Sequence, residues 1–187
     1  MHIPKTAGTS LYKLAQQQYE KDERLLILVG RDLSQLSKKV DKEKVKFIQG
    51  HYPFGIHQYF NFPPNYFTML RDPVDRVISE YYFIKKVPRH DLYIYEQIKK
   101  NNMSLEDYID MENEKFLFRT HNMQTRFLTG GEVIDLKKAK ENMLNYFSVV
   151  GITEMFEQTI HLLNKKLGWK KIKLIKSALE NKKKMNF

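Results

Sequence analysis

Residues 66–82, YFTMLRDPVDRVISEYY, join an apolar run to an amphipathic segment through a short polar junction. The first five of these residues are mostly apolar or aromatic and predict a buried strand. Asp72 is a favoured N-cap residue and Pro73 is favoured at the first helical position, so we expect the chain to turn from strand into helix directly after Arg71. A strand that leads straight into a helix is the building unit of α/β folds.

The same alternation of strand and helix patterns continues along the chain. Short runs rich in β-branched or aromatic residues predict strands at Leu25–Val29, Val45–Ile48, Tyr66–Leu70 and Ser148–Val150. Apolar residues at helical spacing predict helices at Thr9 to Tyr19, Pro73 to Lys86, Ser104–Asp110, Asp135–Tyr146 and Thr153–Leu167. The order favours a parallel sheet flanked by helices. Because there is no internal repeat and no Gly-rich or Pro-rich linker, we expect one α/β domain that spans residues 1–187.

The composition limits the class of protein. Of the 187 residues, 42% are hydrophobic, which is enough for a core, and the lack of Cys excludes a disulfide framework and a thiolate metal site. The formal net charge of +10 indicates an anionic partner. No apolar run approaches the roughly 20 residues that cross a bilayer, and the start lacks the apolar stretch of a signal peptide. We therefore expect a cytoplasmic chain without a transmembrane segment.

A second motif lies at the start of the chain, where PKTAGTSL (residues 4–11) opens an amphipathic segment. A helix N-terminus attracts anions through its unpaired N–H groups and its dipole, Gly8 lets the backbone approach a ligand, and Lys5 adds a positive charge. Three hydroxyl groups are further donors, those of Thr6, Thr9 and Ser10. On the residues alone an ordinary helix cap fits equally well. A Walker A loop is excluded, because it places Lys immediately before Ser or Thr at its end.

Arg71 stands at the carboxyl end of a predicted strand, the edge where open parallel sheets bind ligands. Ser79 follows two helical turns later, and an Arg with a nearby hydroxyl binds phosphate through charge-assisted hydrogen bonds. A structural ion pair for Arg71 and an exposed helix position for Ser79 are the alternatives. Arg76 is expected to pair with Asp75 or Glu80.

Together the two motifs resemble those of a known enzyme family. HIPKTAGTS (residues 2–10) resembles the 5′-phosphosulfate loop of the sulfotransferases that use 3′-phosphoadenosine 5′-phosphosulfate (PAPS), and residues 70–82 resemble their 3′-phosphate motif. The resemblance is closest to the branch of the heparan sulfate 2-O- and 6-O-sulfotransferases and their bacterial relatives, and it covers residues 1–169. Three further stretches resemble that branch: Gly50–Gly55, Asn122–Leu128 and Val150–Glu154.

The resemblance implies a three-layer P-loop-like fold and a PAPS-dependent O-sulfotransferase. Such an enzyme transfers a sulfuryl group to a carbohydrate acceptor, releases 3′-phosphoadenosine 5′-phosphate (PAP) and needs no metal. The residues implied for the 5′-phosphosulfate are Lys5, Thr6, Ala7, Gly8, Thr9 and Ser10. Those implied for the 3′-phosphate are Arg71 and Ser79, and those expected to line the nucleotide or acceptor cleft are Gln124 and Arg126.

Sulfuryl transfer to an alcohol is an in-line displacement that needs a base for the hydroxyl proton and a cation near the departing oxygen. Of the six histidines, His51 alone follows a predicted strand through a Gly, and a neutral imidazole is a suitable base near pH 7. For a lone His a structural role would be the better interpretation, but the matching family motif favours His51 as the base. Lys5 is expected to face the departing oxygen and His57 the acceptor.

Two parts of the chain depart from the family pattern. Members of the family carry a full apolar strand before the phosphate loop, whereas this chain starts at Met1 and has almost no residues to form it. Two alternatives stay open: the start is misassigned or trimmed, or a central strand is missing and stability suffers. The segment 170–187 is Lys-rich and also departs from the pattern. The stretch from Lys165 to Lys184 holds nine lysines and a single acid, Glu180, and is expected to be a solvated tail.

Two alternative functions remain open. A nucleotide kinase-like phosphotransferase shares the strand, loop and helix of the phosphate site, but the sequence lacks the Walker lysine and an evident magnesium-binding acid. A non-catalytic polyanion-binding module would use the basic surface alone. The sequence holds no recognised nucleic-acid-binding module, so no nucleic-acid partner is expected.

Overall fold

The computed structural model describes residues 1–28, 30–87 and 91–170. β1 (Arg24–Ile27) pairs in parallel with β2 (Phe47–Gly50), and β3 (Tyr66–Leu70) pairs in parallel with β4 (Phe147–Ile152). The expected α/β class with parallel strands is therefore confirmed. The expected single sheet is not, because the described strands form two separate pairs.

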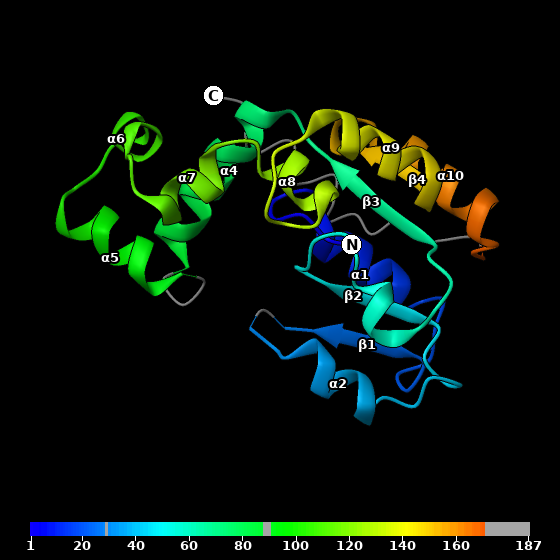
Figure 1. The fold of residues 1–187 in the computed structure, drawn as a ribbon. Coiled ribbons are helices and arrows are strands. Elements are labelled where there is room, and N and C mark those ends of the chain that lie inside the picture. The colour runs from blue at the N-terminus through cyan, green and yellow to red at the C-terminus, as the bar shows by residue number, and fades with distance from the viewer. Residues whose placement is uncertain (29, 88–90, 171–187) are drawn as a thin grey trace.

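The N-terminal residues lie between the two sheets (Figure 1). The amino group of Met1 donates to the carbonyl of Phe67 in β3 at 3.2 Å, and the N–H of His2 donates to the carbonyl of Gly50 in β2 at 3.1 Å. Met1 and His2 therefore make one backbone bond each, to the strands on opposite sides of them. Two bonds do not make a ladder, and in the part of the chain that the structure describes no strand precedes α1.

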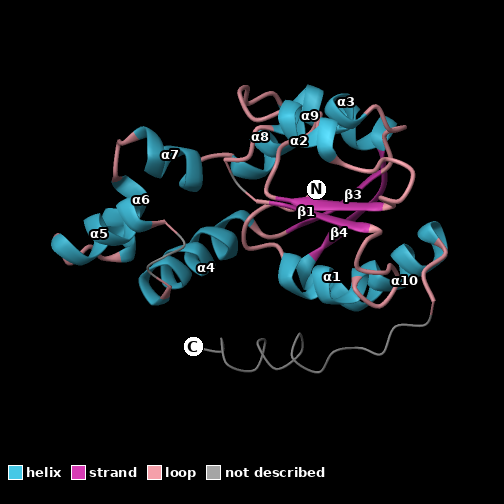
Figure 2. Cartoon of the chain, turned by 90° about the horizontal axis from the view of Figure 1, so that it is seen from below, coloured by secondary structure: helices cyan, strands magenta, loops and turns pink. Residues whose placement is uncertain are grey.

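Helices lie on both sides of the strands (Figure 2). On one side are α1 (Gly8–Ala15) and α10 (Phe156–Leu167), and on the other α2 (Leu33–Lys39), α3 (His57–Phe60), α8 (Met123–Thr129) and α9 (Leu136–Tyr146). The 3₁₀ turn Thr153–Met155 joins β4 to α10. The main core packs α1 and α10 against the strands through Leu14, Met69, Val149 and Leu163. Burial of these side chains stabilises the packing of both sheets against the same two helices, α1 and α10.

Four further helices project to one side of the strands (Figure 1): α4 (Pro73–Lys86), α5 (Leu92–Lys100), α6 (Leu105–Asp110) and α7 (Glu114–Thr120). They share a second core that includes Tyr81, Ile94 and Tyr108. A buried ion cluster also joins them, since fully buried Glu80 accepts from Arg76 at 2.6 Å and from Arg119 at 2.5 Å. Of the two partners expected for Arg76, Asp75 and Glu80, the structure shows Glu80.

The predicted cap of α4 is confirmed, because Asp72 accepts hydrogen bonds from the N–H groups of Val74 and Asp75. A capping box of Ser104 and Asp107 starts α6. The strand and the helix on either side of Arg71 have the predicted bounds.

One predicted helix is too long, because α1 ends at Ala15 and not near Tyr19. The Tyr19 ring instead stacks on Phe47 at 5.3 Å, and its hydroxyl accepts from the indole N–H of Trp169 at 3.1 Å. Within the predicted strand Leu25–Val29, Val29 lies outside the described residues, as do residues 171–187 of the Lys-rich segment. None of the helices in the described ranges is long and apolar enough to cross a membrane.

Candidate functional site

The loop before α1 presents backbone N–H groups to one side. Lys5 and Ala7 have positive φ values of 67° and 61°, and the first hydrogen bond of the helix runs from the N–H of Leu11 to the carbonyl of Ala7. The N–H groups of the three residues before Leu11 therefore have no partner inside the helix. The hydroxyl of buried Thr6 donates inward to the carbonyl of Ile3 at 2.8 Å, so this side chain stabilises the loop. Such a loop is a suitable anion site.

Gly8 is required by a neighbouring side chain. A Cβ atom at this position would lie 1.7 Å from Nε2 of His2 and within 2.1 Å of two carbon atoms of the same ring. The carbonyl of Gly8 accepts a hydrogen bond from the side-chain amide of Gln49 in β2 at 3.2 Å. The expected reason for this glycine was close approach to a ligand, and the structure adds that its missing side chain makes room for His2.

The ammonium group of Lys5 lies over the ring of Phe83 in α4, 3.6 Å from the ring centre. Burial lowers the pKa of Lys5 to about 8; Glu80 opposes this shift and the positive charge of Arg71 adds to it. Lys5 therefore remains mostly charged at pH 7. The aromatic face of Phe83 contacts the ammonium group, and the negative charge of Glu80 stabilises its charged form.

Arg71 lies beside the loop, as the position of the strand end predicts. Its Nη1 donates to the carbonyl of Lys5 at 3.4 Å. The side-chain amide of Gln124 forms two bonds to the backbone of Arg71: Oε1 accepts from its N–H at 2.9 Å and Nε2 donates to its carbonyl at 2.8 Å. Gln124 was expected to line a cleft. In the structure its amide fixes the backbone of Arg71, the residue that follows β3.

His51 follows β2 through Gly50, as predicted, and lies next to His2. Its Nδ1 is 3.1 Å from the carbonyl oxygen of His2. A carbonyl only accepts hydrogen bonds, so Nδ1 carries the proton in this contact and the lone pair of the neutral ring is on Nε2. The two rings are in contact and tilted by 33° to each other, with centres 4.1 Å apart. This arrangement gives the ring the tautomer that a general base acting through Nε2 needs.

His57 lies at the other end of β3. Its Nδ1 contacts the hydroxyl of Tyr66 at 2.8 Å, and burial lowers its pKa. Tyr66 begins β3 and Leu70 ends it, so the residue that His57 contacts lies about 13 Å along the strand from the end that leads to Arg71. The structure therefore brings together Lys5, Arg71 and His51 but does not add His57 to them.

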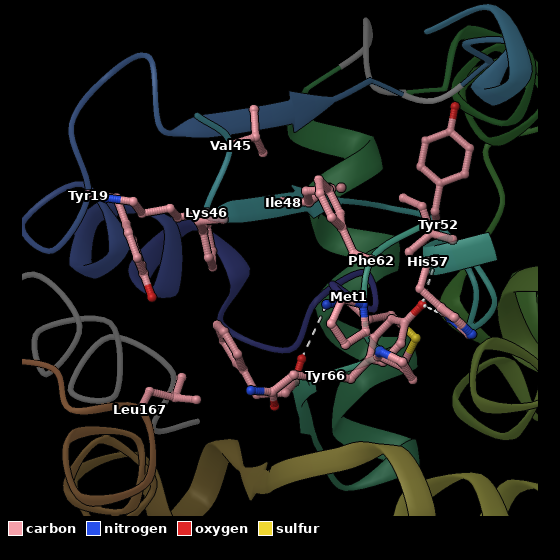
Figure 3. Close-up of a pocket in the computed structure, with 17 residues that line it drawn as sticks. Met1, Tyr19, Val45, Lys46, Ile48, Tyr52, His57, Phe62, Tyr66 and Leu167 are labelled. Atoms are coloured by element: carbon pink, nitrogen blue, oxygen red, sulfur yellow. Dashed lines mark hydrogen bonds between the residues drawn. The ribbon is translucent and has the colours of Figure 1, made fainter. Parts of the chain in front are cut away.

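His57 lines a cavity of about 290 Å³ between β2 and β3 (Figure 3). Met1 lies at this cavity, and its amino group is directed to the carbonyl of Phe67. Burial lowers the pKa of this amino group to about 5. An amine at this position is therefore neutral in the folded chain at pH 7.

The remaining predicted residues lie on helices around the loop. Thr9 is exposed and Ser10 is half-buried at the start of α1, and half-buried Ser79 lies on α4. Arg126 on α8 donates to the carbonyl of Glu132 at 3.3 Å and lies over the ring of Phe118. It lines an open hollow of about 680 Å³ beside α7. Among the residues described, no group of three or more His, Cys, Asp or Glu side chains could hold a metal ion.

The sequence did not indicate that His2 contacts His51 or that Gln124 binds the backbone of Arg71. Both contacts join positions about 50 residues apart, 49 in the first case and 53 in the second. The only sequence signal was that all four residues belong to stretches with family resemblance. Spacing along the chain carries no information on such pairs.

Comparisons with known proteins show which family the whole chain is similar to. A model of the sulfotransferase family matches residues 1–185. Heparan sulfate 2-O-sulfotransferase 1 of Xenopus laevis is 24% identical over 184 residues, and that of Gallus gallus is 24% identical over 188; each alignment covers 86% of this chain and 52% of the relative. A heparin sulfate O-sulfotransferase of Drosophila melanogaster is 24% identical over 112 residues, which cover 56% of this chain and 32% of that protein. The chain thus spans about half the length of the vertebrate relatives and a third of the insect one. Since the family model covers nearly every residue, the chain belongs to the sulfotransferase family.

Proposed function

We propose that this chain is a PAPS-dependent O-sulfotransferase. The observation that carries the proposal is the convergence of three groups at the carboxyl ends of β2 and β3: the anion loop with Lys5, the guanidinium group of Arg71 and the imidazole of His51. An anion site, a second cation and a base are the three components that transfer from a phosphosulfate donor to a hydroxyl needs.

The fold we propose is the three-layer P-loop-like arrangement in one domain. Helices on both sides of parallel strands support it, as does the loop that leads into α1. In this arrangement the phosphate loop follows the position between β2 and β3 that Met1 and His2 occupy. Ligands of such folds bind at the carboxyl ends of the strands, where Arg71 and His51 lie.

The residues at the loop fit a phosphosulfate group. The outward N–H groups at the start of α1 would hold its oxygens, and the charge of Lys5 would stabilise the negative charge that develops on the departing oxygen. Arg71 would bind the 3′-phosphate, and the hydroxyl of Ser79 would form one side of that site. PAPS supplies the activated sulfuryl group when it is bound. Sulfuryl transfer to a hydroxyl requires no metal ion, so the reaction we propose has none.

His51 would accept the proton of the acceptor hydroxyl at Nε2. The bond from Nδ1 to the carbonyl of His2 keeps the proton on Nδ1, leaves the lone pair on Nε2 and fixes the ring in one orientation. For the acceptor we propose a carbohydrate, because two relatives are named as heparan sulfate 2-O-sulfotransferases and a third as a heparin sulfate O-sulfotransferase. Gln124 would act by keeping Arg71 in place, and Arg126 would lie at the acceptor side of α8.

The test is transfer of radioactive sulfate from labelled PAPS to a heparan sulfate chain from which the O-sulfates have been removed. Wild type should label the polysaccharide, and His51→Ala should lose about a thousandfold or more of the rate while it still binds PAP. His161→Ala, which removes an exposed histidine of α10, is the matched control and should keep the wild-type rate. Labelling by His51→Ala at the wild-type rate would contradict the role of the base. Hydrolysis of magnesium-ATP in place of sulfate transfer would favour a kinase-like enzyme.

A further inference from the structure

The ring of His2 lies between the phosphate loop and the base. On one side it occupies the space above Gly8, where a Cβ atom would lie 1.7 Å from Nε2. On the other side it packs against the ring of His51 at a tilt of 33°, with ring centres 4.1 Å apart. The backbone of His2 is fixed as well, because its N–H donates to Gly50, the residue before His51. His2 therefore connects the start of α1 with the end of β2.

Two contacts from the same residue define the orientation of the His51 ring. The carbonyl oxygen of His2 lies 3.1 Å from Nδ1 and fixes rotation of the ring in its own plane. The imidazole of His2 lies against the ring face and limits rotation out of that plane. A base held at two points stays within the narrow range of geometry that proton transfer needs.

The charge state of His2 agrees with such a role. Burial is the largest cause that lowers its pKa well below the usual value, and a positive charge on His51, on the Met1 amino group or on Lys5 would lower it further. These neighbours come from the end of β2, the chain start and the phosphate loop. His2 is thus neutral at pH 7 and acts there as a flat, uncharged surface.

We propose that His2 is a positioning residue, whose ring, seated on Gly8, holds the imidazole of His51 in the orientation for proton transfer. The inference rests on the proposed function, since it assigns His51 as the base. Gly8 is part of the phosphate loop, so the ring of His2 also fixes the position of His51 relative to the donor site. His2 itself exchanges no proton with the substrate.

Two variants separate packing from titration. His2→Ala removes the ring but keeps the carbonyl, and kcat for sulfate transfer to de-O-sulfated heparan sulfate should fall roughly 10- to 100-fold. KM for PAPS should stay within about threefold, because the loop N–H groups and Arg71 are retained. His2→Phe restores a flat ring that does not titrate and should recover kcat to within about threefold of wild type. An unchanged kcat in His2→Ala, or equal loss in both variants, would overturn the positioning role.

A second measurement does not depend on turnover. Nitrogen-15 NMR of the histidine rings in the full chain should show His51 with its proton on Nδ1 in all three proteins, because each keeps the carbonyl of residue 2. The ring signals of His51 should be broadened by exchange in His2→Ala but not in wild type or His2→Phe, and equally narrow signals in all three proteins would contradict the inference. If wild type transfers no sulfate but the spectra change as expected, the proposed function fails and the positioning contact stands.

Discussion

Acetylation of the Met1 amino group should stabilise the folded chain in a pH-dependent way. The amino group is buried between the two sheets, where it donates to Phe67 at 3.2 Å, and burial lowers its pKa from 8.0 to about 5. Between these two values the unfolded chain binds a proton that the folded chain does not. Stability therefore rises with pH across this window, and the destabilising effect is greatest below about pH 5 and absent above about pH 8.

The size of the effect follows from the two pKa values. At 1.36 kcal/mol per pKa unit, the amine destabilises the fold by about 1.4 kcal/mol at pH 7, by about 2.7 kcal/mol at pH 6 and by nothing at pH 9. An acetylated amine does not titrate, it still donates one N–H to Phe67, and the acetyl group can enter the adjoining cavity of about 290 Å³. The acetylated chain should gain stability by these amounts.

Urea unfolding followed by circular dichroism, with acetylated and unmodified chains at pH 6, 7 and 9, measures the difference. The comparison at pH 9 is the internal control, because there the two chains should unfold at the same urea concentration. A gain that is equal at pH 6 and pH 9 would show that the amine is not buried as a neutral group. No gain at any pH would refute the position of Met1 between β2 and β3.

Glu80→Gln removes a fully buried negative charge that pairs with buried Arg76 and half-buried Arg119, so urea unfolding should show a loss of about 3 kcal/mol or more. Lys44→Gln, at an exposed ion pair, should change little, and equal stability of the two variants would argue against a buried cluster. Gln124→Leu removes both bonds to the backbone of Arg71, and calorimetry should show PAP binding weakened about tenfold; unchanged affinity would mean that the strand end needs no clamp. Four Val and Ile residues joined ahead of Met1 should raise the melting temperature more than four Gly and Ser residues, and equal melting temperatures would contradict a strand position between the sheets.

Much of the fold could be predicted where local chemistry sets the boundary. Asp72 and Pro73 stop a strand and start a helix by capping alone, and both elements have the predicted bounds. α1 was predicted too long because Tyr19 fits the helical pattern, yet its ring is drawn to Phe47 and Trp169, which are distant in sequence. Five short helices were not predicted: α2, α3, α5, α7 and α8. α5 has an amphipathic pattern of its own and the N-cap Asp91, so local chemistry could have revealed it. The other four have four to seven residues, too few for a periodic pattern to stand out, and they depend on packing with their neighbours.

The site divides in the same way. The positions of Lys5, Arg71 and His51 could be predicted, because strand ends and a helix start are local features that parallel topology brings to one edge. The contacts of His2 and Gln124 could not, since each depends on a pair of residues that only the folded chain brings together. His57 was placed with the acceptor on sequence proximity to His51, but α3 carries it toward the amino end of β3.

The most direct test of the central claim is the thermal stability of the chain with and without PAP, for wild type, Arg71→Ala and His51→Ala. PAP at 100 times its dissociation constant stabilises a folded protein by about 2.7 kcal/mol, which a melting curve resolves clearly. We expect wild type and His51→Ala to melt at higher temperature with PAP, and Arg71→Ala to show no shift. If folded wild type does not respond to PAP, or if heparin shifts all three proteins equally and PAP shifts none, the nucleotide site at the loop and Arg71 is contradicted.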